Sequence, residues 1–201
     1  MYKRFGKRFS DIIIAVAGLI VLSPLFIFLT LLLYFLNNRQ PFFYQPRPGL
    51  NRKIFIIIKF KTMTDPTQPS RNENADHQRI TTIGGLLRKT SLDELPQLWN
   101  VLKGEMSLIG PRPLLTEYLP LYNNHEIRRH EVKPGITGWG QVHGRNNISW
   151  TEKFKYDLWY VENQSLALDM NILFLTIKSV FSHLRTNAPQ AIPDKFQGSQ
   201  N

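Results

Sequence analysis

Two carboxylates stand next to each other in the sequence, Asp93 and Glu94, at the expected start of a helix. Apolar residues recur at helical spacing from Leu95 to Leu102, and Gly104 is a suitable end for this helix. Acidic residues at a helix start often do no more than cap its free amides, so the position alone favours a structural role. Neighbouring carboxylates also repel each other, however, and a Mg²⁺ ion relieves that repulsion. The pair is therefore a candidate for binding Mg²⁺ and, at a helix N-terminus, phosphate.

Two capping arrangements are compatible with this helix start. Ser91 and Glu94 have the spacing of a capping box. Asp93 as the N-cap instead puts Pro96 at the third helical position, where no backbone hydrogen bond is lost. Either arrangement leaves both carboxylates at the N-terminus of the helix.

Basic residues suited to phosphate occur on either side of this pair. Arg112 lies between Pro111 and Pro113, so the turn is stiff, and a guanidinium can bind phosphate through two parallel hydrogen bonds. Lys59 lies in a β-rich segment, where it is either an edge lysine that extends into solvent or a ligand for an anionic substrate. The strand pattern by itself favours the edge lysine.

The elements that position these residues begin with an apolar run of 24 residues without a charge, Ile12 to Phe35. As a helix it would be about 36 Å long, against a hydrocarbon thickness of about 30 Å. Ser23 and Pro24 lie at its centre; proline lacks an N–H and clashes with the carbonyl of Ile20, which a serine hydroxyl can satisfy. The run predicts a membrane-associated helix with a sharp break at Ser23 and Pro24.

The charge distribution bears on how this helix meets a membrane. Residues 1–64 hold ten Lys and Arg and one acidic residue, which gives +9 of the formal net charge of +10. The bases flank the apolar run on both sides, and the cytoplasmic membrane surface attracts bases. A straight span would send one basic flank outward, so we favour a re-entrant hairpin over a straight span. A buried helix of a soluble protein is the remaining alternative.

Composition excludes other classes of protein. There is no cysteine, so neither a disulfide framework nor a thiolate metal site can form. A pI near 9.9 is also typical of nucleic-acid-binding proteins. Here, however, the excess charge flanks the apolar run and no nucleic-acid-binding motif is present, so we expect no nucleic acid partner.

The other segments predict an α+β fold that is mostly helical. They comprise a small β-hairpin over 42–61, a polar loop over 64–78, a short helix over 80–89, a helical region over 114–131 broken at Pro120, a Gly-rich loop or bulged strand over 133–146, a helix that starts at a capping box of Ser149 and Glu152, and an amphipathic helix over 170–185. The last helix lies either in the core or on a membrane surface. We expect a membrane-inserted re-entrant helix with basic flanks in 1–38, a cytoplasmic catalytic domain with interfacial amphipathic helices in 39–185, and a flexible tail in 186–201.

Five segments, in order, resemble the bacterial sugar transferase family, the monotopic phosphoglycosyl transferases. They are residues 59–63 (KFKTM), 90–98 (TSLDELPQL), 100–104 (NVLKG), 106–113 (MSLIGPRP) and 133–141 (KPGITGWGQ). The resemblance extends from the N-terminal apolar segment to about residue 182, and it shows no departure at Asp93 and Glu94. The chain looks like the short form of the family.

The resemblance implies site residues and a covalent reaction. Asp93 matches the nucleophile and Glu94 its dyad partner, and both would bind Mg²⁺. A carboxylate can attack phosphorus to give an acyl phosphate, which divides one difficult displacement into two. Lys59, Arg112 and Arg145 match basic positions near the phosphates. Arg88 is a further candidate for binding the substrate or its phosphates, as is Asp157, on the inward face of its helix.

The resemblance also implies partners and a location. A UDP-sugar and polyprenyl phosphate would react to give a polyprenyl-diphosphate-sugar and UMP, at the cytoplasmic face of the bacterial inner membrane and in contact with its anionic lipids. Within the family, the chain is most similar to transferases that move phospho-N,N′-diacetylbacillosamine to undecaprenyl phosphate and so open N-linked protein glycosylation. Sugar specificity would reside in loops, for which 64–78 and 140–150 are the candidates.

Three alternatives stay open at this point. One is the same reaction with another UDP-HexNAc, for O-antigen, capsule or exopolysaccharide. The second is a non-catalytic basic membrane scaffold, which would explain the apolar run and the charge but not the acidic pair. The third is a membrane pyrophosphatase that hydrolyses nucleotide sugars.

Overall fold

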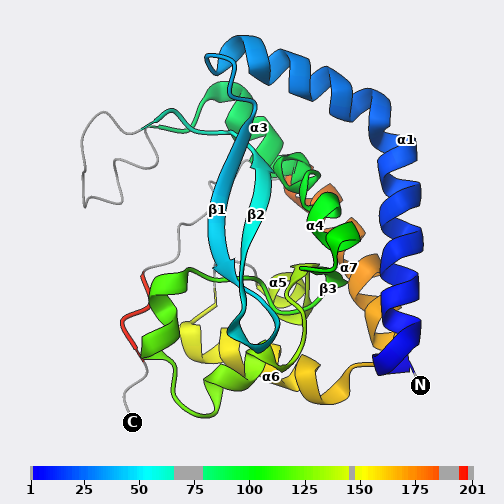
Figure 1. The fold of residues 1–201 in the computed structure, drawn as a ribbon, viewed down its shortest axis with the longest axis vertical. Coiled ribbons are helices and arrows are strands. Elements are labelled where there is room, and N and C mark those ends of the chain that lie inside the picture. Colours follow the sequence, from blue (N-terminus) through cyan, green and yellow to red (C-terminus); the bar gives the residue numbers. More distant parts are fainter. Residues whose placement is uncertain (1, 66–78, 145–147, 186–194, 199–201) are drawn as a thin grey trace.

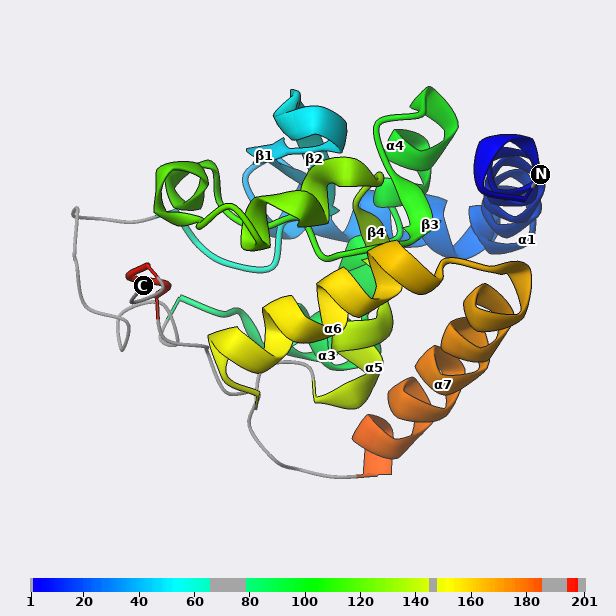
Figure 2. The ribbon, with the colours of Figure 1, turned by 90° about the horizontal axis from the view of Figure 1, so that it is seen from below.

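The computed structural model describes residues 2–65, 79–144, 148–185 and 195–198 of the chain. A long helix, α1 (Lys7–Leu36), follows one turn of π-helix (Tyr2–Gly6) and encloses one side and the top of the molecule in Figure 1. A β-hairpin lies at the centre of that view. Shorter helices lie between the hairpin and α1. Helix α6 (Trp150–Asn163) crosses the bottom of the molecule in Figure 1, and α7 (Leu166–Arg185) runs behind the other elements (Figure 2).

Helix α1 bends sharply near its middle (Figure 1), and Pro24 is the proline inside it. The hydroxyl of Ser23 donates a hydrogen bond to the carbonyl of Ile20, at 2.8 Å. That carbonyl is the one that the missing N–H of Pro24 leaves without its helical partner. The bend expected at Ser23 and Pro24 is therefore confirmed. The Ser23 hydroxyl supplies the hydrogen bond that the Ile20 carbonyl would otherwise lack in an apolar environment.

Both arms of α1 are attached to the same folded body. Near the N-terminus, Lys7 forms an ion pair with Asp169 at 2.8 Å, and Arg8 donates to the carbonyl of Leu102 at 2.8 Å. Asp11 accepts from the hydroxyl of Ser107 at 3.0 Å. Beyond the bend, the chain is attached again, because the Asn37 amide donates to the carbonyl of Lys61 at 2.8 Å. Both ends of the bent helix are thus held by the same folded body.

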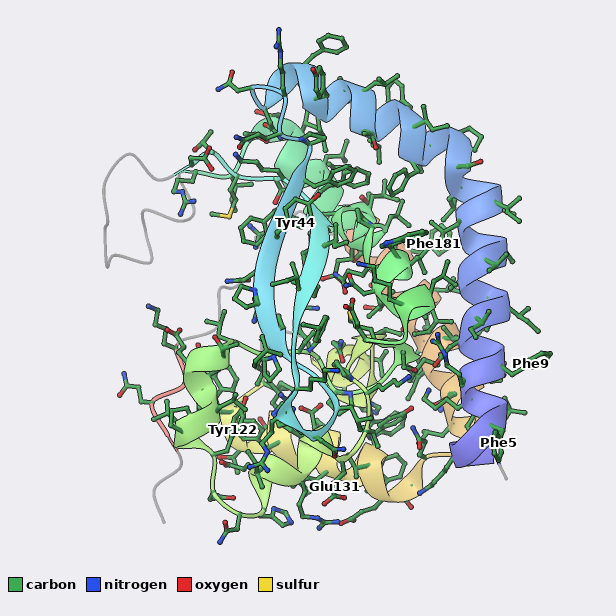
Figure 3. The ribbon with its side chains drawn as sticks, in the orientation of Figure 1. Phe5, Phe9, Tyr44, Tyr122, Glu131 and Phe181 are labelled. Atoms are coloured by element: carbon green, nitrogen blue, oxygen red, sulfur yellow. The ribbon has the colours of Figure 1, made fainter. Side chains whose placement is uncertain are left out.

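Most of the α1 surface is nevertheless exposed and apolar. It is the one helix, among the described residues, that is long and apolar enough to cross a membrane, and 11% of its most apolar window is buried. The rings of Phe5 and Phe9 point away from the body (Figure 3). The core helix of a soluble protein would be mostly buried, so that alternative is wrong.

The predicted β-hairpin is confirmed. Strand β1 (Phe42–Pro48) pairs antiparallel with β2 (Ile54–Phe60), from Phe42 opposite Phe60 to Pro48 opposite Ile54. A short 3₁₀ segment (Leu50–Arg52) forms the turn, with Asn51 in the left-handed region.

A second, smaller sheet was not expected. Strand β3 (Ser107–Ile109) pairs in parallel with β4 (Gly135–Thr137), which lies in the Gly-rich segment. The backbones approach so closely that a Cβ on Gly135 would lie 2.1 Å from the amide nitrogen of Gly110. The glycines therefore permit the pairing, and periodicity in so short a strand cannot reveal it.

The helices follow the predicted order, with some corrections. They are α3 (Thr82–Thr90), η3 (Leu92–Glu94), α4 (Gln97–Lys103), η4 (Thr116–Leu121), η5 (Glu126–Glu131), α5 (Trp139–His143), α6 (Trp150–Asn163) and α7 (Leu166–Arg185). The region 114–131 forms two 3₁₀ segments in place of an α-helix. Pro120 lies inside the first of them, so the predicted break at Pro120 is wrong, and the interruption falls at residues 122–125. The capping box of Ser149 and Glu152 at the start of α6 is confirmed.

Two apolar clusters hold these elements around the candidate site. The larger one joins β2, α4, β3, α6 and α7 through side chains that include Ile57, Val101, Met106, Tyr160 and Ile172. The smaller one lies under the second arm of α1 and includes Leu29, Leu33, Phe60 and Leu87. Phe60 and Leu87 are the neighbours of Lys59 and Arg88, so the smaller cluster fixes the backbone on either side of those two cations.

Helix α7 presents two different apolar faces. Ile172 is fully buried against the larger cluster, whereas Phe174, Ile177 and Phe181 on another face are each more than half exposed. The sequence left open whether this helix lies in the core or on a membrane surface. The buried face of α7 confirms a place in the core, and the membrane-surface role of the exposed face stays a prediction.

Candidate active site

Asp93 and Glu94 lie in η3, a single 3₁₀ turn between α3 and α4. The turn begins with Ser91 in the left-handed region, at φ 58°, which redirects the chain after α3. Helix α4 begins only at Gln97, with Pro96 at its N-cap. Both capping arrangements predicted from the sequence are therefore wrong. The acidic pair precedes the helix on a tight turn, held between two elements that are themselves packed.

Glu94 joins three segments that are far apart in the sequence. Its Oε1 accepts hydrogen bonds from Lys59 Nζ at 2.7 Å and from Arg112 Nη2 at 3.1 Å. The side chains of Glu94 and Lys59 are 14% and 20% exposed, whereas that of Arg112 is 44% exposed. Lys59 thus points inward to the carboxylate, and the edge-lysine interpretation is wrong. Arg112 keeps part of its guanidinium available to a ligand.

Asn100 of α4 holds the strand that carries Lys59. Its side chain is fully buried; its Oδ1 accepts from the amide of Ile58 at 3.1 Å, and its Nδ2 donates to the carbonyl of Ile56 at 2.7 Å. These bonds satisfy the edge of β2 just before Lys59. This role of Asn100 was not predicted, although a polar residue among the apolar positions of a helix is a signal for such a contact.

The charges around the pair make the two carboxylates different. Burial and the neighbouring Glu94 carboxylate raise the pKa of Asp93 to about 6, although nearby cations oppose the shift. Burial also acts to raise the pKa of Glu94, but the contacts with Lys59 and Arg112 outweigh it and hold that pKa at about 2. Asp93 is therefore the more basic of the two, and Glu94 stays ionised.

Two more arginines donate hydrogen bonds to backbone carbonyls of the turn that carries Arg112. Arg129 Nη2 donates to the carbonyl of Arg112 at 2.8 Å, and Arg47 Nη1 donates to the carbonyl of Pro113 at 3.3 Å. Burial and the nearby Arg112 lower the pKa of Arg47 to about 10. Neither Arg47 nor Arg129 was predicted as part of the site, because each comes from an element that only the tertiary fold brings there.

Comparison with known proteins decides the family. Residues 2–183 match the model of the bacterial sugar transferase family. The chain belongs to the bacterial sugar transferase family. It is a phosphoglycosyl transferase.

Individual relatives of this transferase cover most of its length. It is 51% identical to "Uncharacterized sugar transferase EpsL" of Bacillus subtilis over 87% of this chain and 86% of the relative. It is 38% identical to "Exopolysaccharide production protein ExoY" of Sinorhizobium fredii, over 87% and 85%. It is 40% identical to the undecaprenyl-phosphate galactose phosphotransferase of Salmonella typhimurium, over 88% of this chain but 40% of that longer protein.

The other predicted site residues of the transferase lie at different places. Arg88 is in the last turn of α3, close enough for its positive charge to oppose part of the rise in the pKa of Asp93. Asp157 of α6 is 3% exposed, and its Oδ2 accepts from Arg129 Nη2 at 2.6 Å. Asp157 is therefore buried away from ligands. It contacts Arg129, which in turn contacts the backbone of Arg112. Arg145 lies outside the described residues, as do residues 66–78 of the candidate specificity loop.

The carboxylates of this transferase could hold a magnesium ion. Over the described part of the chain, no three His, Asp or Glu side chains cluster in a way that would enclose a metal. Mg²⁺ does not need such a cage, because it commonly binds one or two carboxylates together with waters and substrate phosphates. Burial and the neighbouring Glu94 raise the pKa of Asp93, and a cation beside the pair would favour its ionised form. Asp93 and Glu94 therefore fit an ion that arrives with the substrate.

One cavity of about 1100 Å³ lies away from these residues. It runs along α6 and is lined by side chains that include Trp150, Phe154, Trp159 and Glu162. Neither carboxylate of the pair is among the lining residues, so the cavity is not part of the candidate active site.

Proposed function

We propose that this transferase moves a sugar 1-phosphate from a UDP-sugar to polyprenyl phosphate and releases UMP, with Asp93 as the nucleophile. The observation that carries the proposal is the geometry of the dyad. Asp93, whose pKa is raised, lies beside Glu94, whose carboxylate accepts hydrogen bonds from Lys59 and Arg112. Two relatives are named undecaprenyl-phosphate galactose phosphotransferase and undecaprenyl-phosphate glucose phosphotransferase, and these names support the choice of lipid acceptor.

The reaction takes place in two displacements at one phosphorus atom. An Asp93 carboxylate oxygen attacks the phosphorus that carries the sugar, and the bond from this phosphorus to the bridging oxygen breaks. UMP leaves with the bridging oxygen, and the sugar phosphate stays on Asp93 as an acyl phosphate. A phosphate oxygen of the polyprenyl phosphate then attacks the same phosphorus. The bond to Asp93 breaks, which frees the carboxylate and gives the polyprenyl-diphosphate-sugar.

The surrounding cations make this approach of anion to anion possible. Arg112 has a partly exposed side chain whose guanidinium can bind a diphosphate, and Arg88 adds positive charge near Asp93. Lys59 neutralises Glu94 from the protein side, so the field at Asp93 is less repulsive. A bound Mg²⁺ ion would supply further charge neutralisation of the diphosphate at Asp93 and Glu94.

Helix α1 would hold this site at the membrane as a re-entrant anchor. Its two ends are fastened to one folded body by Lys7 and Asn37, while its apolar surface is exposed in between. A helix that crossed the bilayer would need its ends on opposite sides. The bent geometry therefore supports a monotopic protein at the cytoplasmic face of the inner membrane, with the basic flanks of α1 against anionic lipid.

Helix α7 is the best candidate among the predicted interfacial helices. Its exposed apolar side chains are spaced along one face: Leu166, Met170, Phe174, Ile177 and Phe181. Such a face suits the boundary between headgroups and acyl chains. Because α1 remains inserted, changing Phe174 and Phe181 to Asp should then lower the detergent concentration that releases the protein from membranes, and an unchanged concentration would remove α7 from the anchor.

The sugar is a separate question from the reaction. Resemblance to the transferases of protein glycosylation favours UDP-N,N′-diacetylbacillosamine. A second candidate is a UDP-hexose or another UDP-HexNAc for exopolysaccharide or capsule, because relatives carry the names exopolysaccharide production protein and galactosyl transferase.

A panel of UDP-sugars tests both the reaction and the sugar. Purified protein, Mg²⁺ and polyprenyl phosphate are mixed with each UDP-sugar, and UMP is measured. We expect turnover with one sugar or a few, and no sustained turnover when the lipid is omitted. Absence of UMP with every sugar would support a non-catalytic scaffold, and sustained release without lipid would support a pyrophosphatase.

A further inference from the structure

Arg129 and Asp157 form a buried ion pair between η5 and α6. They are 2% and 3% exposed, and Arg129 donates to Asp157 Oδ2 from both Nε at 3.1 Å and Nη2 at 2.6 Å. Removing two charges from water is costly, and a buried pair often stabilises a fold no better than apolar side chains would. The pair therefore calls for an explanation other than stability alone.

The same Arg129 nitrogen also reaches the backbone of the site. Nη2 donates to the carbonyl of Arg112 at 2.8 Å, while the Arg112 guanidinium contacts Glu94 on the other side of the turn. Arg112 lies between two prolines, which have no N–H to donate, so the carbonyls are the main polar groups by which this turn can be held. Arg47 holds the next carbonyl, that of Pro113.

Charge balance explains why an acidic partner is needed behind the turn. A buried guanidinium can donate to a carbonyl only if its own charge is compensated. Asp157 provides that compensation and fixes the orientation of the guanidinium plane through two hydrogen bonds. The chain of contacts then runs from Asp157 to Arg129, to the Arg112 backbone, and through the Arg112 side chain to Glu94.

We propose that Arg129 and Asp157 are positioning residues that fix the Arg112 turn so that its guanidinium meets the substrate diphosphate. The inference rests on the proposed function, in which Arg112 binds the phosphates. It assigns Asp157 an indirect role in catalysis in place of direct contact with the substrate. A displacement of a binding group by about 1 Å can reduce the rate roughly 100-fold, so a support of this kind has a measurable effect.

The test compares replacement of the pair in two backgrounds. The double variant Arg129→Met with Asp157→Leu removes both charges and leaves neither one stranded in the interior. In the otherwise unchanged protein we expect kcat/KM for UMP release to fall roughly 10- to 100-fold, with the UDP-sugar chosen as the most active of the panel. In an Arg112→Ala background the same double variant should change kcat/KM less than twofold, because the group that it positions is already absent.

A matched control is available on the same two elements. Arg128 of η5 and Glu162 of α6 form a surface ion pair at 3.1 Å, and Arg128→Met with Glu162→Leu should leave kcat/KM unchanged. Thermal unfolding confirms that each variant is folded. Should the buried double variant not fold, Arg129→Lys, which keeps the charge but loses the planar fork, is measured in the same two backgrounds.

The outcomes separate this inference from the proposed function. An equal loss of activity in both backgrounds would show that the pair has a general structural role and would overturn the inference. Normal activity of Arg112→Ala alone would instead contradict the proposed role of Arg112. The positioning role is supported if the double variant lowers kcat/KM in the unchanged protein but not in the Arg112→Ala background, and if the control pair has no effect.

Discussion

Asp93 and Glu94 are neighbours in the chain, but their side chains have different partners. Lys59 and Arg112 keep Glu94 ionised, whereas burial and repulsion leave Asp93 with a pKa of about 6. A nucleophilic carboxylate benefits from that higher basicity. The sequence supplied the two residues, and the difference between them comes from side chains of two other segments.

Arg112→Lys should cause a large loss of activity although it keeps the positive charge. Lysine lacks the planar fork that can bind Glu94 and phosphate together, so we expect kcat/KM for UMP release to fall roughly 100-fold. The same change at a partly exposed arginine outside the site, Arg128→Lys, is the control. Kinetics within twofold of the unchanged protein would reduce Arg112 to a structural residue.

His130 should make the fold less stable in mild acid. It is buried, its Nδ1 lies 3.2 Å from the carbonyl of Gly49, and Tyr122, Arg129 and Arg52 surround it. Burial and the nearby arginines lower its pKa from 6.5 to about 4. The unfolded chain therefore binds a proton more readily, so stability is full above pH 6.5 and declines as the pH falls toward 4.

The size of this effect follows from the pKa difference. At about 1.4 kcal/mol per pKa unit, the loss on acidification approaches roughly 3 kcal/mol. Thermal unfolding of the detergent-solubilised protein between pH 7 and 4 should show a smaller decline for His130→Gln than for the unchanged protein. The exposed His125→Gln is the control. Parallel declines in all three proteins would mean that the pKa of His130 is the same in the folded and the unfolded chain.

The contact between α4 and β2 is what places Lys59 beside Glu94. Asn100 makes this contact through two hydrogen bonds to the backbone of β2. A third hydrogen bond, from its Nδ2 to Glu105 at 2.7 Å, holds the Asn100 side chain in place. Asn100→Ala leaves buried strand groups without partners, which should cost about 1–3 kcal/mol and loosen the position of Lys59. We expect a lower unfolding temperature together with reduced kcat.

The matched substitution is Asn163→Ala, at an exposed position near the end of α6. It should change neither the unfolding temperature nor kcat appreciably. If Asn100→Ala lowers the unfolding temperature but leaves kcat intact, the position of Lys59 does not depend on this contact.

Elements with strong local signals were predictable. The hairpin over 42–61, the α6 capping box and the break at Pro24 depend on alternation, spacing and proline chemistry that are all local. Elements that depend on distant partners were not. The β3–β4 pairing joins segments 26 residues or more apart through glycine contacts, and the 114–131 region has helical composition but forms 3₁₀ turns.

The same distinction applies to the site. Asp93, Glu94, Lys59 and Arg112 were predicted, and the structure brings Lys59, Glu94 and Arg112 into direct contact. Arg47, Arg129 and Asn100 were not predicted, because they act on the backbone of a segment remote in sequence. No local pattern encodes which carbonyl a buried arginine will hold.

At the scale of the whole molecule, the bent α1 links the site to the membrane. Its two arms are fastened to the body that carries Asp93, so the depth of the anchor sets the height of the site above the lipid. Single-cysteine labels placed at residues 3 and 195 of this cysteine-free chain test the topology. Both should react with an impermeant reagent only from the cytoplasmic side.

Labelling of the two positions from opposite sides would mean that α1 spans the bilayer. A matched site within the described body, such as the exposed His125→Cys, reports the cytoplasmic side in the same experiment. The re-entrant arrangement requires all three labels to agree.

The most direct test of the account is a search for the covalent intermediate on Asp93. The protein is mixed with its preferred UDP-sugar and Mg²⁺ in the absence of polyprenyl phosphate, quenched in acid and digested for mass spectrometry. The account predicts a sugar-phosphate adduct on the peptide that contains Asp93, which disappears when polyprenyl phosphate is added, and Asp93→Asn should neither form the adduct nor turn over. Full turnover by Asp93→Asn, or an adduct on a different residue, would contradict the assignment of Asp93 as the nucleophile.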